Sequence, residues 1–144
     1  MADYFTKFSL ILKLPDEAAQ KFALALANQA RDIANGNELP GNFPASLVEA
    51  VEDWQFETEA ESSPDNWELW MHSDCGGIDA VCAFIQHLLH TFNPNGSVTF
   101  EWSNDCSKPR VDAYGGGASV ITSDEIKIMS TWQWLREHAP QAAL

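Results

Sequence analysis

The residue types best suited to chemistry are concentrated in one segment near the C-terminal end of the sequence. This segment combines acids, bases, a tyrosine and three consecutive glycines: Asp105, Lys108, Arg110, Asp112, Tyr114, Gly115, Gly116 and Gly117. Backbone N–H groups of a glycine run can cradle an anion, and nearby cations add to the attraction. The Walker spacing is absent, and no helix is expected directly after the glycines. Two expectations stay open: a small-ligand site, or a bulge and close strand crossing that only glycine tolerates.

Cysteine and histidine suggest two further kinds of chemistry. Cys106 is a candidate nucleophile with His87 or His90 as its base, but the neighbouring carboxylate would raise the thiol pKa, and no cysteine-enzyme signature is present. The spacings His72-x-x-Cys75 and His87-x-x-His90 suit metal ligands, but paired Cys-x-x-Cys is missing. We therefore predict no catalytic residue, no metal site and no cofactor.

Acidic residues form a second candidate surface. Glu57, Glu59, Glu68 and Trp70 alternate with apolar residues in two neighbouring segments, so they should share the exposed face of a hairpin. Nothing in the pattern separates a general acid from a general base, which argues against paired-carboxylate hydrolysis. Aromatic anchors within a charged rim are common at protein interfaces, so these four residues are candidate partner contacts.

The charge of the chain is strongly segregated along the sequence. The net charge is −13, and residues 32–107 contain 14 acidic and no basic residues, whereas the rest contains seven acidic and eight basic residues. A field of this sign opposes contact with nucleic acid and with anionic membrane surfaces. It favours a basic protein partner, or it serves only to keep the chain in solution.

The candidate ligand segment also carries a resemblance. The residues Trp102-Ser103, Cys106-Ser107-Lys108-Pro109-Arg110 and Tyr114-Gly115-Gly116-Gly117-Ala118 precede a Trp-Leu helix. This pattern resembles a group of small uncharacterised proteins from bacteria, plasmids and phages, over roughly the last third of the chain. The resemblance implies an accessory protein, with a mobile element as one source, and it implies no reaction mechanism.

Apolar periodicity predicts the elements that position these residues. We expect a strand over 5–14, a helix from Pro15 to about residue 34, a short helix after Pro44, a hairpin over 54–72, a helix over 78–92, a strand over 98–102, two short strands over 111–121 and 126–129, and a final helix from Ser130. In the first helix, Ala18, Phe22, Ala25, Leu26 and Ile33 should face the core. Trp132 or Trp134 should dock the last helix together with Leu135.

These elements predict one α+β domain over residues 1–144, with helices on one face of an antiparallel sheet. Their order suggests a ferredoxin-like βαββαβ core with a C-terminal ββα extension. No run of apolar residues reaches the length of a membrane span, and the three cysteines are too few for a disulfide framework. We therefore expect a cytoplasmic protein.

Taken together, these features favour a non-enzymatic protein that binds a basic partner protein. The sharpest version is a nucleic-acid mimic, in which ordered carboxylates imitate phosphates. The alternative is a small-ligand binding protein or an enzyme whose site lies around Asp105–Gly117. The sequence leaves the partner's identity and the oligomeric state open.

Overall fold

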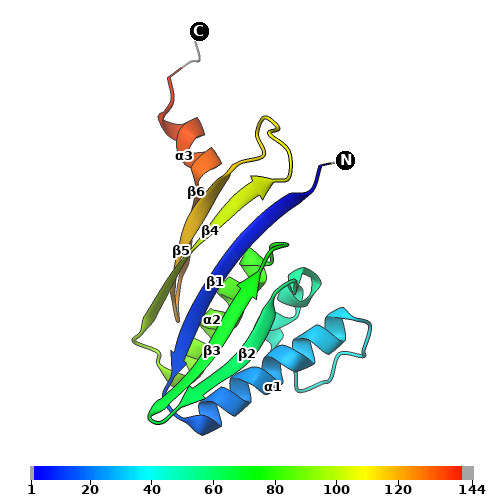
Figure 1. Cartoon of the computed structure of the whole chain (residues 1–144). Coiled ribbons are helices and arrows are strands. Elements are labelled where there is room, and N and C mark those ends of the chain that lie inside the picture. The colour runs from blue at the N-terminus through cyan, green and yellow to red at the C-terminus, as the bar shows by residue number, and fades with distance from the viewer. Residues whose placement is uncertain (1, 141–144) are drawn as a thin grey trace.

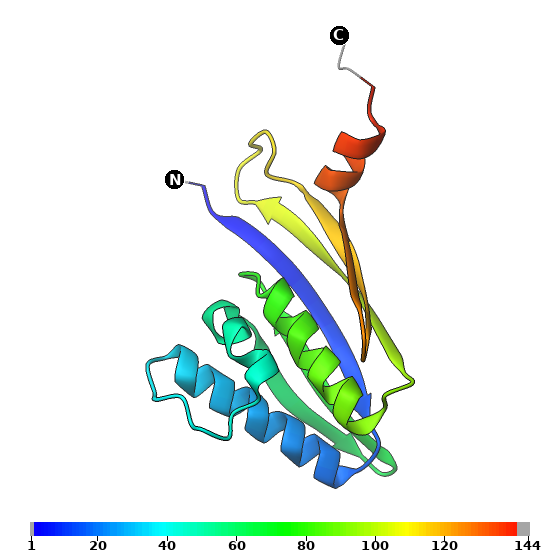
Figure 2. The same cartoon turned by 180° about the vertical axis from the view of Figure 1, so that it is seen from behind.

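The computed structural model describes residues 2–140 and has an α+β architecture (Figures 1 and 2). Its elements are β1 (Tyr4–Leu14), α1 (Glu17–Ala34), the 3-10 helices η1 (Ala45–Leu47) and η2 (Glu49–Asp53), β2 (Glu57–Ser63), β3 (Asn66–Ser73), α2 (Ile78–Phe92), β4 (Ser97–Cys106), β5 (Gly115–Thr122), β6 (Ile126–Ser130) and α3 (Thr131–His138). The strands form one antiparallel sheet in the order β2-β3-β1-β4-β5-β6. Both long helices, α1 and α2, lie on the same face of this sheet.

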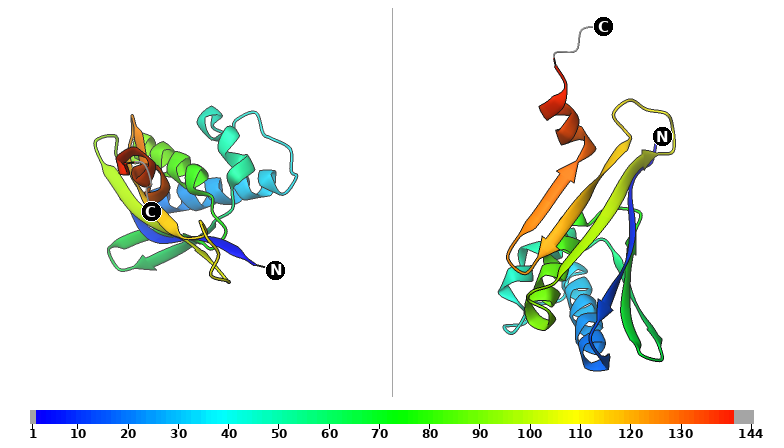
Figure 3. Two further views of the ribbon diagram at one scale, coloured as in Figure 1. Left: turned by 90° about the horizontal axis from the view of Figure 1, so that it is seen from above. Right: turned by 90° about the vertical axis from the view of Figure 1, so that its left-hand side faces the viewer.

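Strand β1 joins the two halves of the sheet. Its residues 8–14 pair with β3, but only Tyr4–Lys7 pair with β4. Beyond that short ladder the two strands diverge, and the sheet is strongly twisted (Figure 3). Within residues 2–140, no helix covers the face opposite α1 and α2 (Figure 1), so that face of the sheet is open.

The core lies between the sheet and the two helices. It contains side chains of β1, β3, β4 and β5 that alternate with exposed ones, and a cluster of aromatic rings in which Trp54, Phe56 and Phe84 pack at centroid separations of 4.7 to 6.2 Å. Full burial of side chains of this size contributes about 1.5–3 kcal/mol each. The helix expected over 78–92 is found as α2, and its buried residues are Ala80, Val81, Cys82, Phe84, Ile85, Leu88 and Leu89.

The buried face of α1 differs from the expectation. The helix begins two residues later than predicted, with Asp16 as the N-cap, and its buried residues are mostly alanines and one leucine: Ala19, Gln20, Ala23, Leu26, Ala27 and Ala30. Phe22 is 43% exposed, whereas Ala23 and Ala30 are fully buried. Small side chains allow the helix to lie close to the sheet. The helix is therefore oriented with its alanines toward the sheet, and the larger Phe22 side chain is left exposed.

The last helix also differs from the expectation. The helix begins where it was expected, and Ser130 is its N-cap, because the Ser130 Oγ accepts a hydrogen bond from the Gln133 N–H at 3.2 Å. However, no residue of α3 is buried, and Trp132, Trp134 and Leu135 are 63%, 49% and 57% exposed. The helix projects beyond the end of the sheet and does not dock on it (Figure 2). Among residues 2–140, no helix is long and apolar enough to cross a bilayer.

Candidate functional site

The open face of the β2–β3 hairpin brings together the predicted partner-binding residues. Leu69 and Met71 of β3 point into the core, so the alternating Glu68 and Trp70 point to the opposite face. The register pairs Glu59 of β2 directly with Trp70. The alternation of buried and exposed residues expected from the sequence is therefore found in the structure. It places Glu59 and Glu68 on the same face as the Trp70 ring.

Three glutamates form a regular row along the outer strand of the sheet. Glu57, Glu59 and Glu61 are exposed at alternate positions of β2, and alternate positions of a strand lie about 7 Å apart. Glu61 was not among the predicted contact residues, although the same alternation in the sequence would have indicated it. Across the hairpin, Glu61 directly faces Glu68, so four carboxylates share this face.

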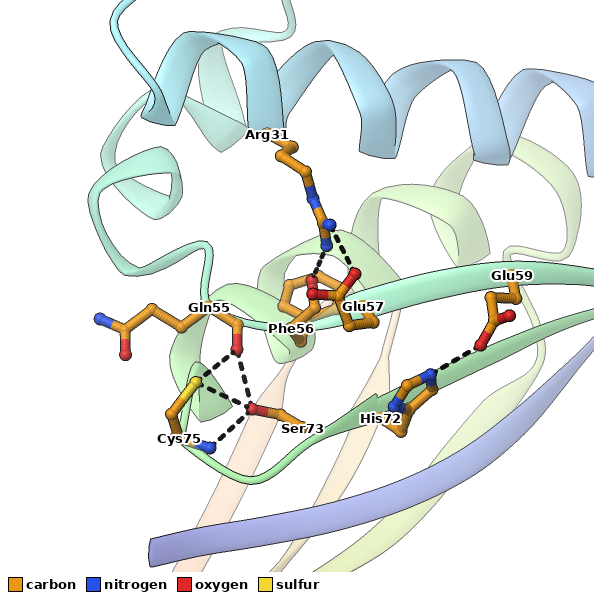
Figure 4. A network of polar contacts seen from close by, with 8 residues as sticks. All are labelled: Arg31, Gln55, Phe56, Glu57, Glu59, His72, Ser73 and Cys75. Carbon is orange, nitrogen blue, oxygen red and sulfur yellow. Dashed lines mark hydrogen bonds and ion pairs between the residues drawn. The ribbon is translucent and has the colours of Figure 1, made fainter. Parts of the chain in front are cut away.

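Two of these carboxylates are held by residues that lie outside their own strand (Figure 4). Arg31 of α1 donates from Nη1 to Glu57 Oε2 at 2.5 Å, and its other terminal nitrogen donates to the Phe56 carbonyl. His72 Nε2 lies 2.9 Å from Glu59 Oε2. Sequence reasoning missed Arg31, because it lies on another element, 26 residues from Glu57. It also missed His72, although the predicted hairpin places that residue diagonally across from Glu59.

Trp70 is fixed in place on the same face. Its indole stacks on the His72 ring with centroids 4.0 Å apart, and its Nε1 donates to Ser9 Oγ at 2.8 Å. The ring is half-buried, so one side remains available for contact. A held aromatic ring loses little conformational freedom when a partner binds, which favours its use as an anchor.

The pair Glu61 and Glu68 has no such neutralising contact. Neither side chain makes an ion pair within residues 2–140. The hairpin is tied at this point by Gln20, whose buried amide donates to the backbone carbonyls of Glu61 at 3.0 Å and Glu68 at 2.9 Å. Like charges directly opposite each other in a sheet destabilise it.

The sheet reduces the charge segregation seen in the sequence. Strand β1 brings Lys7 and Lys13 into the middle of the open face, where Lys13 pairs in register with Glu68. Lys7 Nζ lies 3.2 Å from Asp105 Oδ2. Acidic side chains are therefore most concentrated on the edge strand β2, and they are less concentrated over the rest of the open face.

The predicted ligand segment is divided by the structure. Asp105, Asp112, Tyr114 and Gly116 line a shallow hollow of about 390 Å³, together with Tyr4, Trp132 and neighbouring residues of β1, β4 and α3. Lys108, Arg110, Gly115 and Gly117 do not line it. The hollow therefore has two carboxylates and no cation, which is the reverse of an anion cradle.

Close contacts with neighbouring strands explain why Gly116 and Gly117 are glycines. A Cβ on Gly117 would overlap the Trp102 ring and lie 2.5 Å from the Met129 carbonyl oxygen, and a Cβ on Gly116 would meet the Trp102 carbonyl. The Gly116 N–H donates to Thr131 Oγ1 at 3.1 Å, so it does not point a free donor at a ligand. The contacts with Trp102 and Met129 support the close-crossing expectation.

The charged residues of this segment do not pair with one another. Asp105 pairs with Lys7, and the exposed Arg110 side chain makes no ion pair within residues 2–140. The connecting loop is shaped instead by Tyr114 Oη, which donates to the Lys108 carbonyl at 3.1 Å, and by Asp112, whose φ is 63°. The Arg110 side chain therefore makes no ion pair that would stabilise the loop in the described part of the chain.

The cysteines and histidines do not assemble into a catalytic or metal-binding group. Cys106 is the last residue of β4, whereas the end of α2 that carries His87 and His90 lies near the first residue of that strand. The strand is roughly 30 Å long, so Cys106 and the two histidines lie toward its opposite ends. Burial raises the pKa of the Cys82 thiol, and the hydrogen bond between Cys82 Sγ and Ser119 Oγ only partly offsets this. Within residues 2–140, no three His, Cys, Asp or Glu side chains lie close enough to hold a metal ion.

A separate apolar hollow of about 490 Å³ opens where β1 and β4 diverge. Leu12 and Val98 line it from the two strands, and Leu88 and Phe92 line it from α2. None of the candidate residues predicted from the sequence lies there. The hollow follows from the short β1–β4 ladder, and its lining suggests no chemistry.

Comparison with known proteins adds no family assignment, because no family model, no curated protein and no solved structure matches the chain. The class defined by the observations is that of an α+β protein with a six-stranded antiparallel sheet and one open face.

Proposed function

We propose that this chain is a non-enzymatic binding protein that docks a basic partner protein on the open face of the β2–β3 hairpin. The contact surface consists of the acidic row, defined as Glu57, Glu59, Glu61 and Glu68, with Trp70 at its side. The even spacing of the carboxylates along β2 and the held Trp70 ring support this assignment. A rim of charge around an aromatic anchor suits a polar, specific interface.

The observation that carries the proposal is the direct pairing of Glu61 with Glu68. Like charges placed opposite each other in a sheet cost stability, and neither carboxylate makes an ion pair within residues 2–140, although Lys13 of β1 faces Glu68 in register. A guanidinium or ammonium group of a partner placed between the two carboxylates would remove the repulsion. The free energy released would appear as affinity, which explains why a binding surface retains an unfavourable pair.

The sharper form of the proposal is a nucleic-acid mimic in the cytoplasm, as the resemblance to small uncharacterised proteins from bacteria, plasmids and phages suggests. A row of carboxylates on an exposed edge strand would then occupy the cationic groove of a nucleic-acid-binding protein. The long-range field of the acidic chain would speed the encounter, and it would make the association rate fall as salt is added.

We also infer a finer description of the fold that carries this surface. The order β2-β3-β1-β4 with two helices on one face supports a ferredoxin-like βαββαβ unit, to which β5, β6 and α3 add as a ββα extension. In this layout the acidic row lies on the edge opposite the extension. The layout accommodates many unrelated functions, so the surface carries the functional argument.

A second candidate function has one specific observation in its favour. The hollow beside Asp105 and Asp112 combines two carboxylates with the rings of Tyr4, Tyr114 and Trp132. Carboxylates beside aromatic faces suit a small cationic ligand. Tyr114→Ala would abolish binding at this hollow and leave docking on the acidic row unchanged, which separates the two candidates.

The experiment is a quantitative capture of proteins from the native cell by the tagged chain. The wild type is compared with a variant in which Glu57, Glu59 and Glu61 are all changed to Gln. The matched control changes Glu38, Glu49 and Glu52 to Gln, which removes the same charge from exposed positions outside the sheet. We expect one basic protein to be captured by the wild type and the control, and lost with the first variant or at high salt.

The captured protein is then purified, and its affinity for the three chains is measured in isolation. Equal affinity for the two variants would refute the proposal, because only net charge would then matter. Competition with nucleic acid for the purified partner tests the mimic form. If the chain and nucleic acid bind the partner together, the mimic form is wrong and the docking surface stands.

A further inference from the structure

Strand β2 forms one edge of the sheet, and among residues 2–140 only β3 pairs with it (Figure 1). In an antiparallel hairpin, every second residue directs its backbone N–H and C=O groups to the partner strand, and the residues between direct theirs outward. The residue that precedes the two-residue turn at 64–65 belongs to a hydrogen-bonded pair. The outward groups of β2 are therefore the N–H and C=O groups of Thr58, Ala60 and Ser62, and they are open to a further strand.

The glutamates of β2 decide which strand can pair with these outward groups. Glu57, Glu59 and Glu61 alternate with the residues that carry them, and side chains come closest at such non-hydrogen-bonded positions. A second copy of β2, paired about the central Ala60, would place Glu59 opposite Glu61 on both sides of the axis, so like charges oppose it. A strand with a cation at every second position would instead meet each glutamate with an opposite charge.

The helix side of β2 has room for the other side chains of an added strand. Thr58, Ala60 and Ser62 alternate with the glutamates of the open face, so their side chains lie on the face that carries α1. Ala60 and Ser62 are nevertheless exposed, and Thr58 is only partly buried. Since all three side chains are short, helix α1 leaves this edge accessible to another strand.

We infer that the basic partner contributes an extended segment, which adds to the free edge of β2 as a further strand and carries Lys or Arg at every second position. This inference rests on the proposed function, and it names the form in which the cations reach the acidic row. The cations lie opposite Glu57, Glu59 and Glu61, while the residues between them exchange backbone hydrogen bonds with the outward groups of β2. Backbone pairing supplies affinity in such strand addition, and the alternate side chains supply specificity.

The three glutamates of β2 should contribute unequally to this pairing. Arg31 already holds Glu57, whereas Glu61 makes no ion pair within residues 2–140. A cation placed opposite Glu61 displaces no existing partner, and it offsets the repulsion from Glu68. We therefore expect Glu61→Gln to weaken binding of the basic segment more than Glu57→Gln does.

The inference is tested by titrating the full chain with short synthetic peptides in which arginine alternates with valine. Two further peptides carry backbone N-methyl groups, one on every valine and the other on every arginine. In the added strand the valine N–H groups bond to β2, and the arginine N–H groups point away from it. We expect N-methylation of the valines to weaken binding about tenfold or more, because several hydrogen bonds are lost. The peptide with methylated arginines is the matched control and should bind as the parent peptide does.

The corresponding change in the chain is Ala60→Pro. Proline at this position removes one outward N–H group, and proline is tolerated in edge strands where the N–H faces solvent. We expect a similar loss of peptide binding, while circular dichroism and a melting curve establish that the fold is retained. Ala60→Ser keeps the N–H group and is the control, which should bind as the wild type does. If Ala60→Pro does not fold, the two methylated peptides on the wild-type chain decide the question.

Equal affinity for the two methylated peptides overturns the inference, because the basic segment then docks by charge alone and the proposed function stands. Absence of binding by the parent peptide at roughly millimolar concentration also overturns it. Failure of the proposed function gives a different result. The parent peptide would then bind equally well to the wild type and to the variant in which Glu57, Glu59 and Glu61 are changed to Gln.

Discussion

Glu61 of β2 and Glu68 of β3 face each other directly across the hairpin, and the buried amide of Gln20 ties their backbone carbonyls together. The backbone is thus held firmly at a place where two glutamates face each other in register. Tight backbone support prevents the strands from separating to relieve the repulsion. The arrangement sacrifices stability for a fixed pair of charges, which is typical of a surface that meets a cationic group.

The first prediction concerns this pair. Glu61→Gln should raise the free energy of unfolding by roughly 0.2–1 kcal/mol, because it removes a like-charge pair while keeping the shape of the side chain. Urea unfolding at low salt measures the change, and added salt should diminish the difference between the variant and the wild type. Glu38→Gln, at an exposed position outside the sheet, is the control and should have little effect. A loss of stability in Glu61→Gln would contradict the role given to the pair.

The second prediction concerns the glycine run. Gly117→Ala should destabilise the fold by about 1–3 kcal/mol, because the new Cβ would overlap the Trp102 ring and the Met129 carbonyl oxygen. Thermal unfolding of the variant beside the wild type measures this. Gly41→Ala is the control, since a Cβ there meets nothing within 4 Å and the backbone is not left-handed, so its stability should be unchanged or slightly higher. Equal midpoints for the two variants would show that Trp102 moves freely.

The third prediction separates two arginines. Arg31→Ala should lower stability by about 1 kcal/mol, because it leaves the Phe56 carbonyl and the Glu57 carboxylate without their donor. Arg110→Ala should leave the melting temperature nearly unchanged, because its exposed side chain has no ion pair within residues 2–140. The expectation for Arg110 fails if its midpoint falls as far as that of Arg31→Ala.

The fourth prediction concerns pH. Burial lowers the pKa of His87 below its ordinary value of 6.5, and the neighbouring His90 lowers it further. The unfolded chain therefore binds a proton at a higher pH than the folded chain does. Stability is present above the ordinary histidine pKa and declines as the pH falls through it.

His87→Gln should consequently lose less stability than the wild type between about pH 8 and about pH 5. Urea unfolding across this range gives the two slopes. His138→Gln, at an exposed position on α3, is the control and should follow the wild type. Identical slopes for His87→Gln and the wild type would mean that His87 titrates normally in the folded chain.

Local rules account for much of the secondary structure and for one face of the candidate site. Alternation predicts that Leu69 and Met71 are buried while Glu68 and Trp70 face away, and the structure agrees, because successive residues of a strand point to opposite faces. The helix over 78–92 and the start of the final helix after Ser130 were also correctly predicted. In each case the pattern needs only the geometry of a single element.

Features that depend on contacts between elements could not be predicted in this way. The buried face of α1 consists mostly of alanines, because the closeness of the sheet decides which side chains fit. The charge block of residues 32–107 is interrupted in space by Lys7 and Lys13, since β1 pairs between β3 and β4. A stretch of sequence cannot indicate which strand will lie beside it.

The sequence by itself determined the α+β class, the alternation that exposes the acidic row, and the predominance of negative charge. Only the tertiary structure decided that Arg31 and His72 hold two of the acids, that Lys108 and Arg110 stay out of the hollow beside Asp105, and that α3 is left undocked. The physical reason is the range of the interactions. Alternation and capping act within a few residues, whereas ion pairs, hollows and helix docking join segments whose separation along the chain carries no information about their distance in space.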